Sequence, residues 1–229
     1  MTRQILYLHW KAIRLGLLPL VIAAFGMPLL MIQGLARPER QTDPFYTTLI
    51  LGAMGARLFL LPGLAGVIGI TLALSSWSWD HEMKHVYALS LPIARWRYAV
   101  LKFGAGATLA LAPTLALLVG TLVASSSLTL PPLLHAYPFA VTVRFLLSTL
   151  FVYALVFAFA AGSIRTTVIV LTAFVGLLVV GNLLLDAVGT VLGAPLIANF
   201  NFTQWVFDLF TSWPGPFHIL TGNWAFIDV

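Results

Sequence analysis

Charged residues are so widely separated in this chain that long uncharged, apolar stretches make up most of its length. Residues 15–36 and 58–79 each run for 22 residues without an Asp, Glu, Lys or Arg. About 20 apolar residues in a helix cross the roughly 30 Å hydrocarbon core of a bilayer. Only 8% of the residues are charged and 60% are hydrophobic, whereas soluble domains are about 25% charged and about 45–50% apolar. The sequence therefore predicts an all-α integral membrane protein.

The gaps between charges predict five transmembrane helices within one transmembrane domain, residues 1–229. A charge inside hydrocarbon costs several kcal/mol, so charges mark the ends of spans. The gap between Lys102 and Arg144 holds 41 residues and is broken by three prolines, so we place one span and a short interfacial loop in it. The predicted spans are residues 15–36, 58–79, 103–125, 145–164 and 166–186.

Both ends of the chain are expected to lie at the membrane surface. In residues 1–14, Arg3, Tyr7 and Lys11 share one helical face and apolar residues cover the other, which is typical of an interfacial helix. Residues 187–229 combine prolines, amides and many aromatic residues, a composition that favours the headgroup level. We expect this last stretch to form re-entrant or interfacial helices on the outer face.

The distribution of Lys and Arg predicts the orientation. Eight of the 12 lie in segments on the side of the N-terminus and four lie on the other side. Cytoplasmic loops carry the excess of basic residues. The N-terminus and the loop of residues 80–102 are therefore expected in the cytoplasm, in a multi-pass protein of the cell membrane.

Several kinds of chemistry have no counterpart in the sequence. There is no cysteine, no nucleotide-binding G-x-x-x-x-G-K-[ST] motif and no hydrolase or metalloprotease signature. The net charge of +5 is spread between apolar runs, which favours contacts with membrane lipids and not with nucleic acid. We therefore expect no catalytic residues, no cofactor and no metal. Asn182 is the one strongly polar residue well inside a span, and we expect it to form an interhelical hydrogen bond.

The loop of residues 80–102 is the most charged part of the chain and carries an ordered pattern. An acidic beginning, with Glu82, precedes Leu89-Ser90-Leu91-Pro92, then Ala94-Arg95, and Lys102 follows where the next span begins. This pattern resembles the cytoplasmic loop of the permease subunits of type-two ABC exporters. The close resemblance covers about two dozen residues.

The resemblance implies a permease that forms a homo- or heterodimer and pairs with a separate ATP-binding cassette subunit. The loop would be a coupling helix seated in a cleft of that ATPase. Such a helix needs an apolar face for docking, charged ends that fix its register and a rigid exit into the next span, since the residue before a proline avoids the α region. The residues implied in these roles are Asp80, Glu82, Lys84, Tyr87, Leu89, Leu91, Pro92, Arg95, Arg97 and Lys102.

Simpler explanations exist for some of these residues. Arg95, Arg97 and Lys102 could serve only as positive-inside anchors, and Trp79, Trp96 and Tyr98 fit an aromatic belt. An accessory or scaffold subunit of a membrane complex is the alternative function, because apolar composition and small residues suffice for it.

The resemblance also concerns the end of the chain. The family has a sixth span after the outer segment, and we expect a further apolar span of about 20 residues to follow Val229. The alternatives are a five-span or a self-contained six-span protein.

Overall fold

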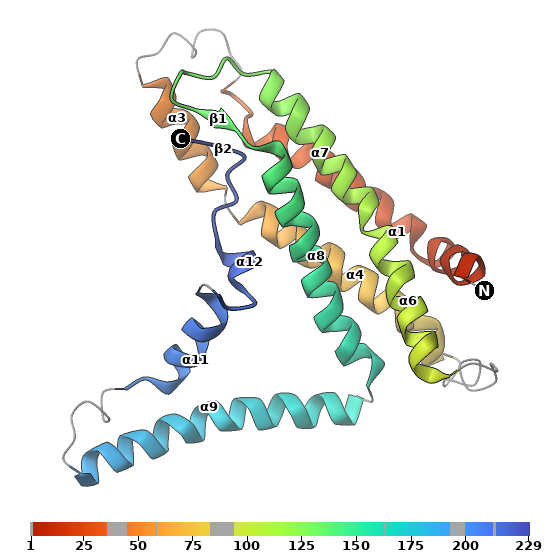
Figure 1. Ribbon diagram of the computed structural model, residues 1–229, viewed down its shortest axis with the longest axis vertical. Coiled ribbons are helices and arrows are strands. Elements are labelled where there is room, and N and C mark those ends of the chain that lie inside the picture. Colours follow the sequence, from red (N-terminus) through yellow and green to blue (C-terminus); the bar gives the residue numbers. More distant parts are fainter. Residues whose placement is uncertain are drawn as a thin grey trace. The chain divides into compact units, whose positions relative to one another are not determined.

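The computed structural model describes residues 2–35, 45–57, 59–82, 94–162, 164–192, 200–212 and 214–229. The chain forms two compact units, Met1–Ala160 with Asn223–Val229, and Ala161–Gly222. The described residues are mostly helical (Figure 1), and they contain five helical segments long and apolar enough to cross a membrane. The prediction of a mostly helical protein with five apolar helical segments of membrane-spanning length is confirmed.

Within the residues that the structure describes, the first unit contains six helices and two very short strands. The helix α1 lies alongside α7 and also contacts α4 and α6. Two helices begin just before a proline, which lacks a backbone donor and is tolerated in the first turn: α4 begins two residues before Pro62, and α7 begins two residues before Pro113. The helices are α1 (Thr2–Met31), α3 (Tyr46–Ala56), α4 (Leu60–Glu82), α6 (Arg95–Leu109), α7 (Leu111–Ser126) and α8 (Pro138–Ala161).

The candidate spans overlap the five predicted ones. They are Ile13–Met31, Tyr46–Ser78, Trp96–Ser126, Pro138–Ala161 and Val168–Val191. The second is longer than predicted, because the apolar helix α3 precedes α4 and adds to it. The predicted interfacial helix of residues 1–14 is not a separate element, since α1 continues from Thr2 through Met31 without a break.

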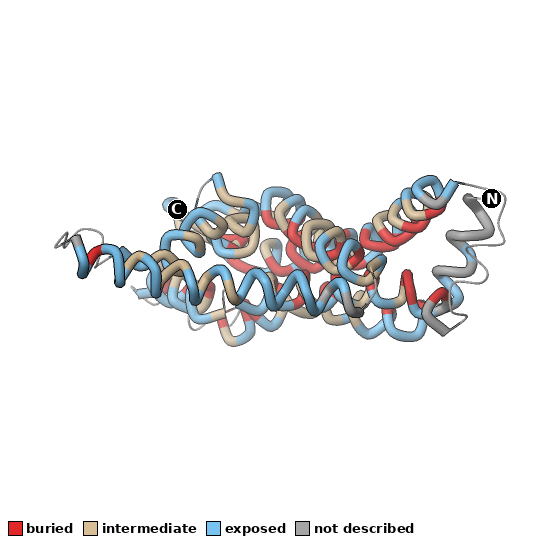
Figure 2. Tube along the Cα trace, turned by 90° about the horizontal axis from the view of Figure 1, so that it is seen from below, coloured by how far each residue is buried: buried red, intermediate tan, exposed pale blue. Residues whose placement is uncertain are grey.

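Burial in the first unit follows the pattern expected of helices in lipid. Figure 2 shows the buried residues on the inward sides of the helices and exposed residues on their outer sides. The outer positions are apolar: Leu15, Ile22 and Phe59 are 78%, 68% and 86% exposed. Water would disfavour such a surface, whereas hydrocarbon accepts it. The largest fully buried side chains include Leu17, Met31, Ile50, Leu61, Ile68, Leu72, Leu117, Phe145, Tyr153, Trp224 and Phe226.

The last seven residues return to the first unit and pair with the segment between α7 and α8. The strands β1 (His135–Ala136) and β2 (Ile227–Asp228) are antiparallel, with His135 opposite Asp228. The Tyr137 amide donates to the Phe226 carbonyl at 2.7 Å. The fold is thus not purely helical, and residues 223–229 lie at the same end of the unit as the 127–137 connection.

The second unit contains α9 (Ile164–Leu192), α11 (Phe202–Thr211) and α12 (His218–Thr221). The helix α9 extends beyond the predicted boundary at residue 186, and its Val168–Val191 stretch has no buried residue in its most apolar window. The ring of Phe202 packs against α9 at Gly181, where a Cβ would lie 2.5 Å from the ring.

Asn182 joins α9 to the beginning of α11. Its Oδ1 accepts from the Phe202 amide at 2.8 Å and from the Thr203 amide at 3.3 Å, and its Nδ2 donates to Thr203 Oγ1. The first amides of a helix have no intrahelical acceptor. The predicted interhelical hydrogen bond of Asn182 is confirmed, and its role is to cap α11.

We expect Asn182→Leu to loosen α11 from α9, because three polar groups at the α11 N-terminus lose their partner. An unsatisfied polar group costs about 1–3 kcal/mol. Amide hydrogen exchange at Phe202 and Thr203 should accelerate by about tenfold or more. The control is Thr190→Ala, since Thr190 bonds only the Asp186 carbonyl of its own helix among the contacts described. Equal exchange in the two variants would contradict the capping role.

Candidate functional site at the ends of the 83–93 segment

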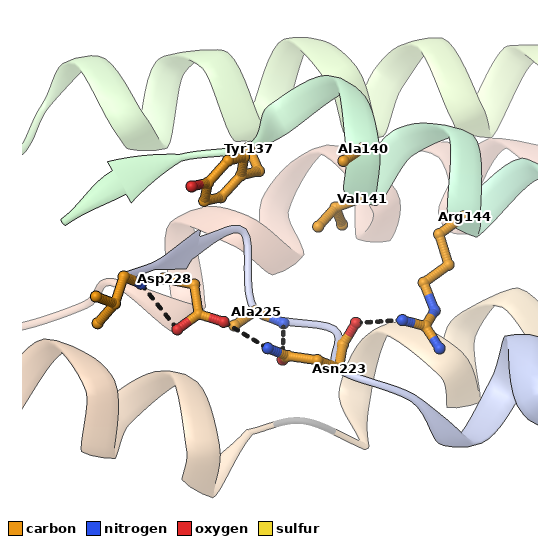
Figure 3. Close-up of a pocket in the computed structure, with 8 residues that line it drawn as sticks. Tyr137, Ala140, Val141, Arg144, Asn223, Ala225 and Asp228 are labelled. Carbon is orange, nitrogen blue, oxygen red and sulfur yellow. Dashed lines mark hydrogen bonds between the residues drawn. The ribbon is translucent and has the colours of Figure 1, made fainter. Parts of the chain in front are cut away.

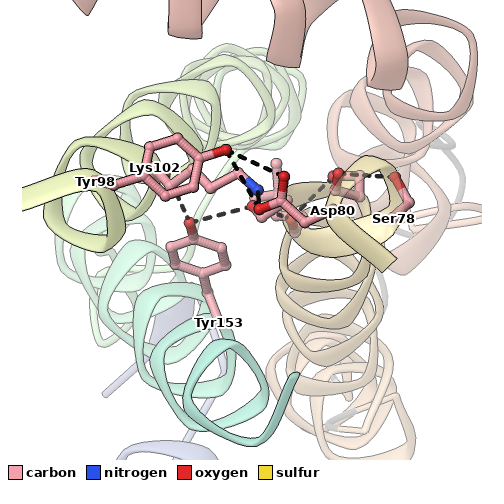
Figure 4. Close-up of polar contacts among 8 residues, drawn as sticks. Ser78, Asp80, Tyr98, Lys102 and Tyr153 are labelled. Atoms are coloured by element: carbon pink, nitrogen blue, oxygen red, sulfur yellow. Dashed lines mark hydrogen bonds and ion pairs between the residues drawn. The ribbon is translucent and has the colours of Figure 1, made fainter. Parts of the chain in front are cut away.

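Two residues of the predicted coupling loop form a buried ion pair. Lys102 on α6 donates from Nζ to Asp80 Oδ2 on α4 at 2.5 Å, and the two side chains are only 7% and 4% exposed. It is the single ion pair found within the described part of the chain. Buried charges are rare in proteins unless they are paired. The structure therefore brings together the first and last residues of the predicted loop (Figure 4).

Helix geometry explains why these residues meet. Asp80 lies two residues before the end of α4, where the helix dipole is negative and disfavours a carboxylate. Lys102 provides the compensating cation. Trp77 and Asp80 are three residues apart on α4, and Tyr98 and Lys102 are four apart on α6, so each helix presents one face carrying an aromatic and a charged residue.

The two aromatic residues surround the ion pair. Tyr98 is buried, and its hydroxyl donates to the Asp80 carboxylate at 3.2 Å and 3.3 Å. The Lys102 ammonium lies 4.4 Å from the Trp77 ring centroid and 5.1 Å from that of Tyr98, within the range of cation–π attraction. Tyr98 was expected in an aromatic belt, whereas its side chain is buried and its hydroxyl is bonded to Asp80.

Tyr153 connects α8 to the same site. Its hydroxyl donates to the Phe103 carbonyl at 3.2 Å and lies 3.4 Å from Ser76 Oγ. Its ring stacks on Phe103 with the centroids 4.9 Å apart. Gly106 leaves space for the hydroxyl, since a Cβ there would overlap it. Three helices are thus held together beside the ion pair.

Among the other predicted loop residues, the structure describes the side chain of Arg97 and not those of the rest. Arg97 is exposed and its guanidinium lies over the Trp96 ring at 5.3 Å. Glu82 ends α4 and Arg95 begins α6, but their side chains lie outside the described residues. Also outside them are Lys84, Tyr87, Leu89, Leu91 and Pro92.

The arrangement is suited to holding two helices together. The charges neutralise each other and are enclosed by aromatic rings, so the site joins the last turn of α4 to the second turn of α6. Over the residues that the structure describes, no three His, Asp or Glu side chains cluster in a way that could hold a metal ion.

The fold and the site define a helical protein with five apolar segments of membrane-spanning length and a buried charge pair at one loop. No family model, no curated protein and no solved structure matches this chain.

Proposed function

We propose that this chain is the membrane-spanning permease subunit of an ABC exporter. It moves a substrate across the membrane when a separate ATP-binding subunit drives it. Two features support the proposal: the Leu89-Ser90-Leu91-Pro92 pattern with Arg95 and Lys102, and the five apolar helical segments.

The buried Asp80–Lys102 pair is the observation that carries the proposal. A coupling loop must transmit a push from the ATPase to the spans on both of its sides. Because Asp80 of α4 and Lys102 of α6 are joined at 2.5 Å, a displacement of one helix would be passed to the other through this pair. A basic residue that only sets membrane topology would stay exposed at the surface. It would not need a buried carboxylate partner, since exposed ion pairs contribute little to stability.

The remaining parts of the proposal rest on the sequence and on what the family resemblance implies, including the second permease. The chain has no nucleotide-binding motif, so ATP hydrolysis belongs to the partner and the permease is not itself an enzyme. A second permease, identical or related, completes the transporter. The protein lies in the cell membrane with its N-terminus and the 83–93 segment in the cytoplasm, on the strength of the eight-to-four division of basic residues.

We expect Glu82→Ala, or the charge reversal Arg95→Glu, to weaken assembly with the ATPase while insertion stays intact. Truncating one partner of a desolvated charge pair at an interface costs about 2–5 kcal/mol, which is about thirtyfold or more in affinity. The measurement is co-purification of the ATP-binding subunit and ATP-driven transport in vesicles.

The matched control is Lys11→Gln, which removes an exposed basic residue from another segment expected in the cytoplasm. It should leave assembly and transport unchanged. Normal transport by both loop variants, with the cognate ATPase present, would show that the charged residues of the loop serve only to set membrane topology. An ATPase that never co-purifies with the unaltered chain would favour the scaffold alternative.

A further inference from the structure

A second polar site lies in the first unit, between α8 and the last residues of the chain (Figure 3). It is a cavity of ≈ 310 Å³ that opens to the surface. We call it the Arg144 cavity. Its lining residues are Tyr137, Ala140, Val141, Arg144, Asn223, Ala225, Asp228 and Val229.

Both walls of the Arg144 cavity are held in place. The α8 wall is one helical face, since Ala140, Val141 and Arg144 follow the spacing of three and four that aligns side chains, and Tyr137 precedes the helix in the same register. The opposite wall is fixed by the β1–β2 pairing and by Trp224, Phe226 and Ile227, which are 1%, 0% and 0% exposed. The cavity therefore belongs to the folded structure of the unit.

Asn223 positions two opposite charges across the cavity. Its carbonyl accepts from Arg144 Nη1 at 2.5 Å, and its Nδ2 donates to Asp228 Oδ2 at 2.6 Å. Its Oδ1 accepts from the Ala225 amide at 2.9 Å, which fixes the side chain. The Arg144 guanidinium also lies 5.2 Å from the Trp224 ring centroid. Arg144 and Asp228 are both half-buried, so each presents its charge where water is partly excluded.

The size and place of the cavity limit what it can bind. Ligand pockets are about 300–1,000 Å³, so ≈ 310 Å³ accommodates a small polar group and not a whole lipid or a large drug. The apolar stretch of α8 begins at Pro138, beside the cavity. For a membrane-spanning α8, the end of the apolar stretch is the level of the lipid headgroups.

We propose that the Arg144 cavity binds an ammonium–phosphate zwitterion, as carried by the headgroup of phosphatidylethanolamine. The Arg144 guanidinium faces the phosphate and the Asp228 carboxylate faces the ammonium. A purely anionic headgroup would meet repulsion from Asp228, and a cation alone would meet repulsion from Arg144. The inference concerns the lipid environment of the chain and does not depend on the ATPase.

The test is a titration of the purified protein in detergent, in which the unfolding temperature is measured at each ligand concentration. The probes are short-chain phosphatidylethanolamine, short-chain phosphatidylglycerol and soluble phosphoethanolamine. A ligand that binds only the folded state raises the unfolding temperature with concentration. We expect the ethanolamine lipid to bind at least about tenfold more tightly than the glycerol lipid. Only the ethanolamine headgroup carries an ammonium that can donate a charge-assisted hydrogen bond to Asp228. An equal response to the soluble zwitterion would support the same chemistry with a soluble occupant.

Two variants separate the site from general lipid contact. Asp228→Asn should remove the preference for ethanolamine over glycerol lipid. Ala140→Leu fills the cavity from an exposed position without altering a charge, and should weaken binding of the ethanolamine lipid about tenfold while the protein remains folded. Unchanged binding in Ala140→Leu, or equal affinity of the unaltered protein for the two lipids, would overturn the proposal.

Discussion

Replacing Asp80 by asparagine is expected to lower the free energy of unfolding by about 3–5 kcal/mol, because it leaves the Lys102 ammonium buried without its counter-charge. The hydrogen bond from Tyr98 can persist to the amide oxygen, so the loss isolates the charge. Equilibrium unfolding in mixed micelles measures the effect. The cation–π contacts of Lys102 with Trp77 and Tyr98 do not replace a carboxylate at 2.5 Å.

The double variant Asp80→Leu/Lys102→Met distinguishes lost attraction from uncompensated charge. Apolar residues of similar volume often replace a buried ion pair at little cost, so the double variant should be more stable than Asp80→Asn. If it also lowers transport while it stays folded, the pair serves coupling more than stability. The control Arg97→Gln removes an exposed cation nearby and should change stability by less than about 0.5 kcal/mol. A loss below about 1 kcal/mol for Asp80→Asn would contradict a buried, paired carboxylate.

The second large effect is expected at Gly120, where the backbones of α1 and α7 approach each other closely. A Cβ on Gly120 would overlap the carbonyl of Phe25 on α1. Because the obstacle is backbone and not a flexible side chain, the helices must separate. Overpacking costs about 1–3 kcal/mol, so Gly120→Ala should destabilise the protein although alanine is the better helix former.

Gly104→Ala is the matched control for this prediction. Gly104 lies in α6 with no atom within 4 Å of an added Cβ, so the substitution should stabilise by up to about 1 kcal/mol through helix propensity. The two variants should thus shift the unfolding temperature in opposite directions. Shifts of the same sign would show that α1 and α7 do not approach each other at Gly120.

The spacing of charges predicted the number of apolar segments, because long uncharged stretches are visible in the local sequence. It did not predict their ends, since Arg57, Lys102 and Arg144 lie inside the segments found. Each predicted span overlaps one of the five apolar segments, and residues 58–79 overlap the second part of the longer Tyr46–Ser78. The helix α3 was missed, although its residues 46–56 contain no charge, because eleven residues are too few to cross a bilayer. The β1–β2 pairing joins segments far apart in the chain and has no local signal beyond the buried aromatics Trp224 and Phe226.

The candidate site was predicted as a set of residues and not as a geometry. Asp80 and Lys102 were both expected at the ends of the loop, but as contacts for a partner protein. Their pairing depends on how α4 and α6 pack, which a single sequence does not reveal. A signal was nevertheless present: Trp77 and Asp80, like Tyr98 and Lys102, are spaced to share a helical face. Tyr153, on α8, could not be assigned from sequence.

Cross-linking from the 83–93 segment tests the central claim most directly. A photoreactive amino acid replaces Tyr87 in cells that express the chain with its neighbouring proteins, and the same substitution at Phe174, an exposed residue of α9, is the control. Because the chain has no cysteine, the single substitution Lys84→Cys also reports the side of the membrane. We predict a covalent adduct between position 87 and a protein carrying a G-x-x-x-x-G-K-[ST] motif, and no such adduct from position 174. We also predict that the thiol introduced at position 84 is protected from an impermeant reagent outside the cell. Labelling of that thiol from outside, or no ATPase adduct from position 87 when the ATPase is present, would contradict the permease assignment.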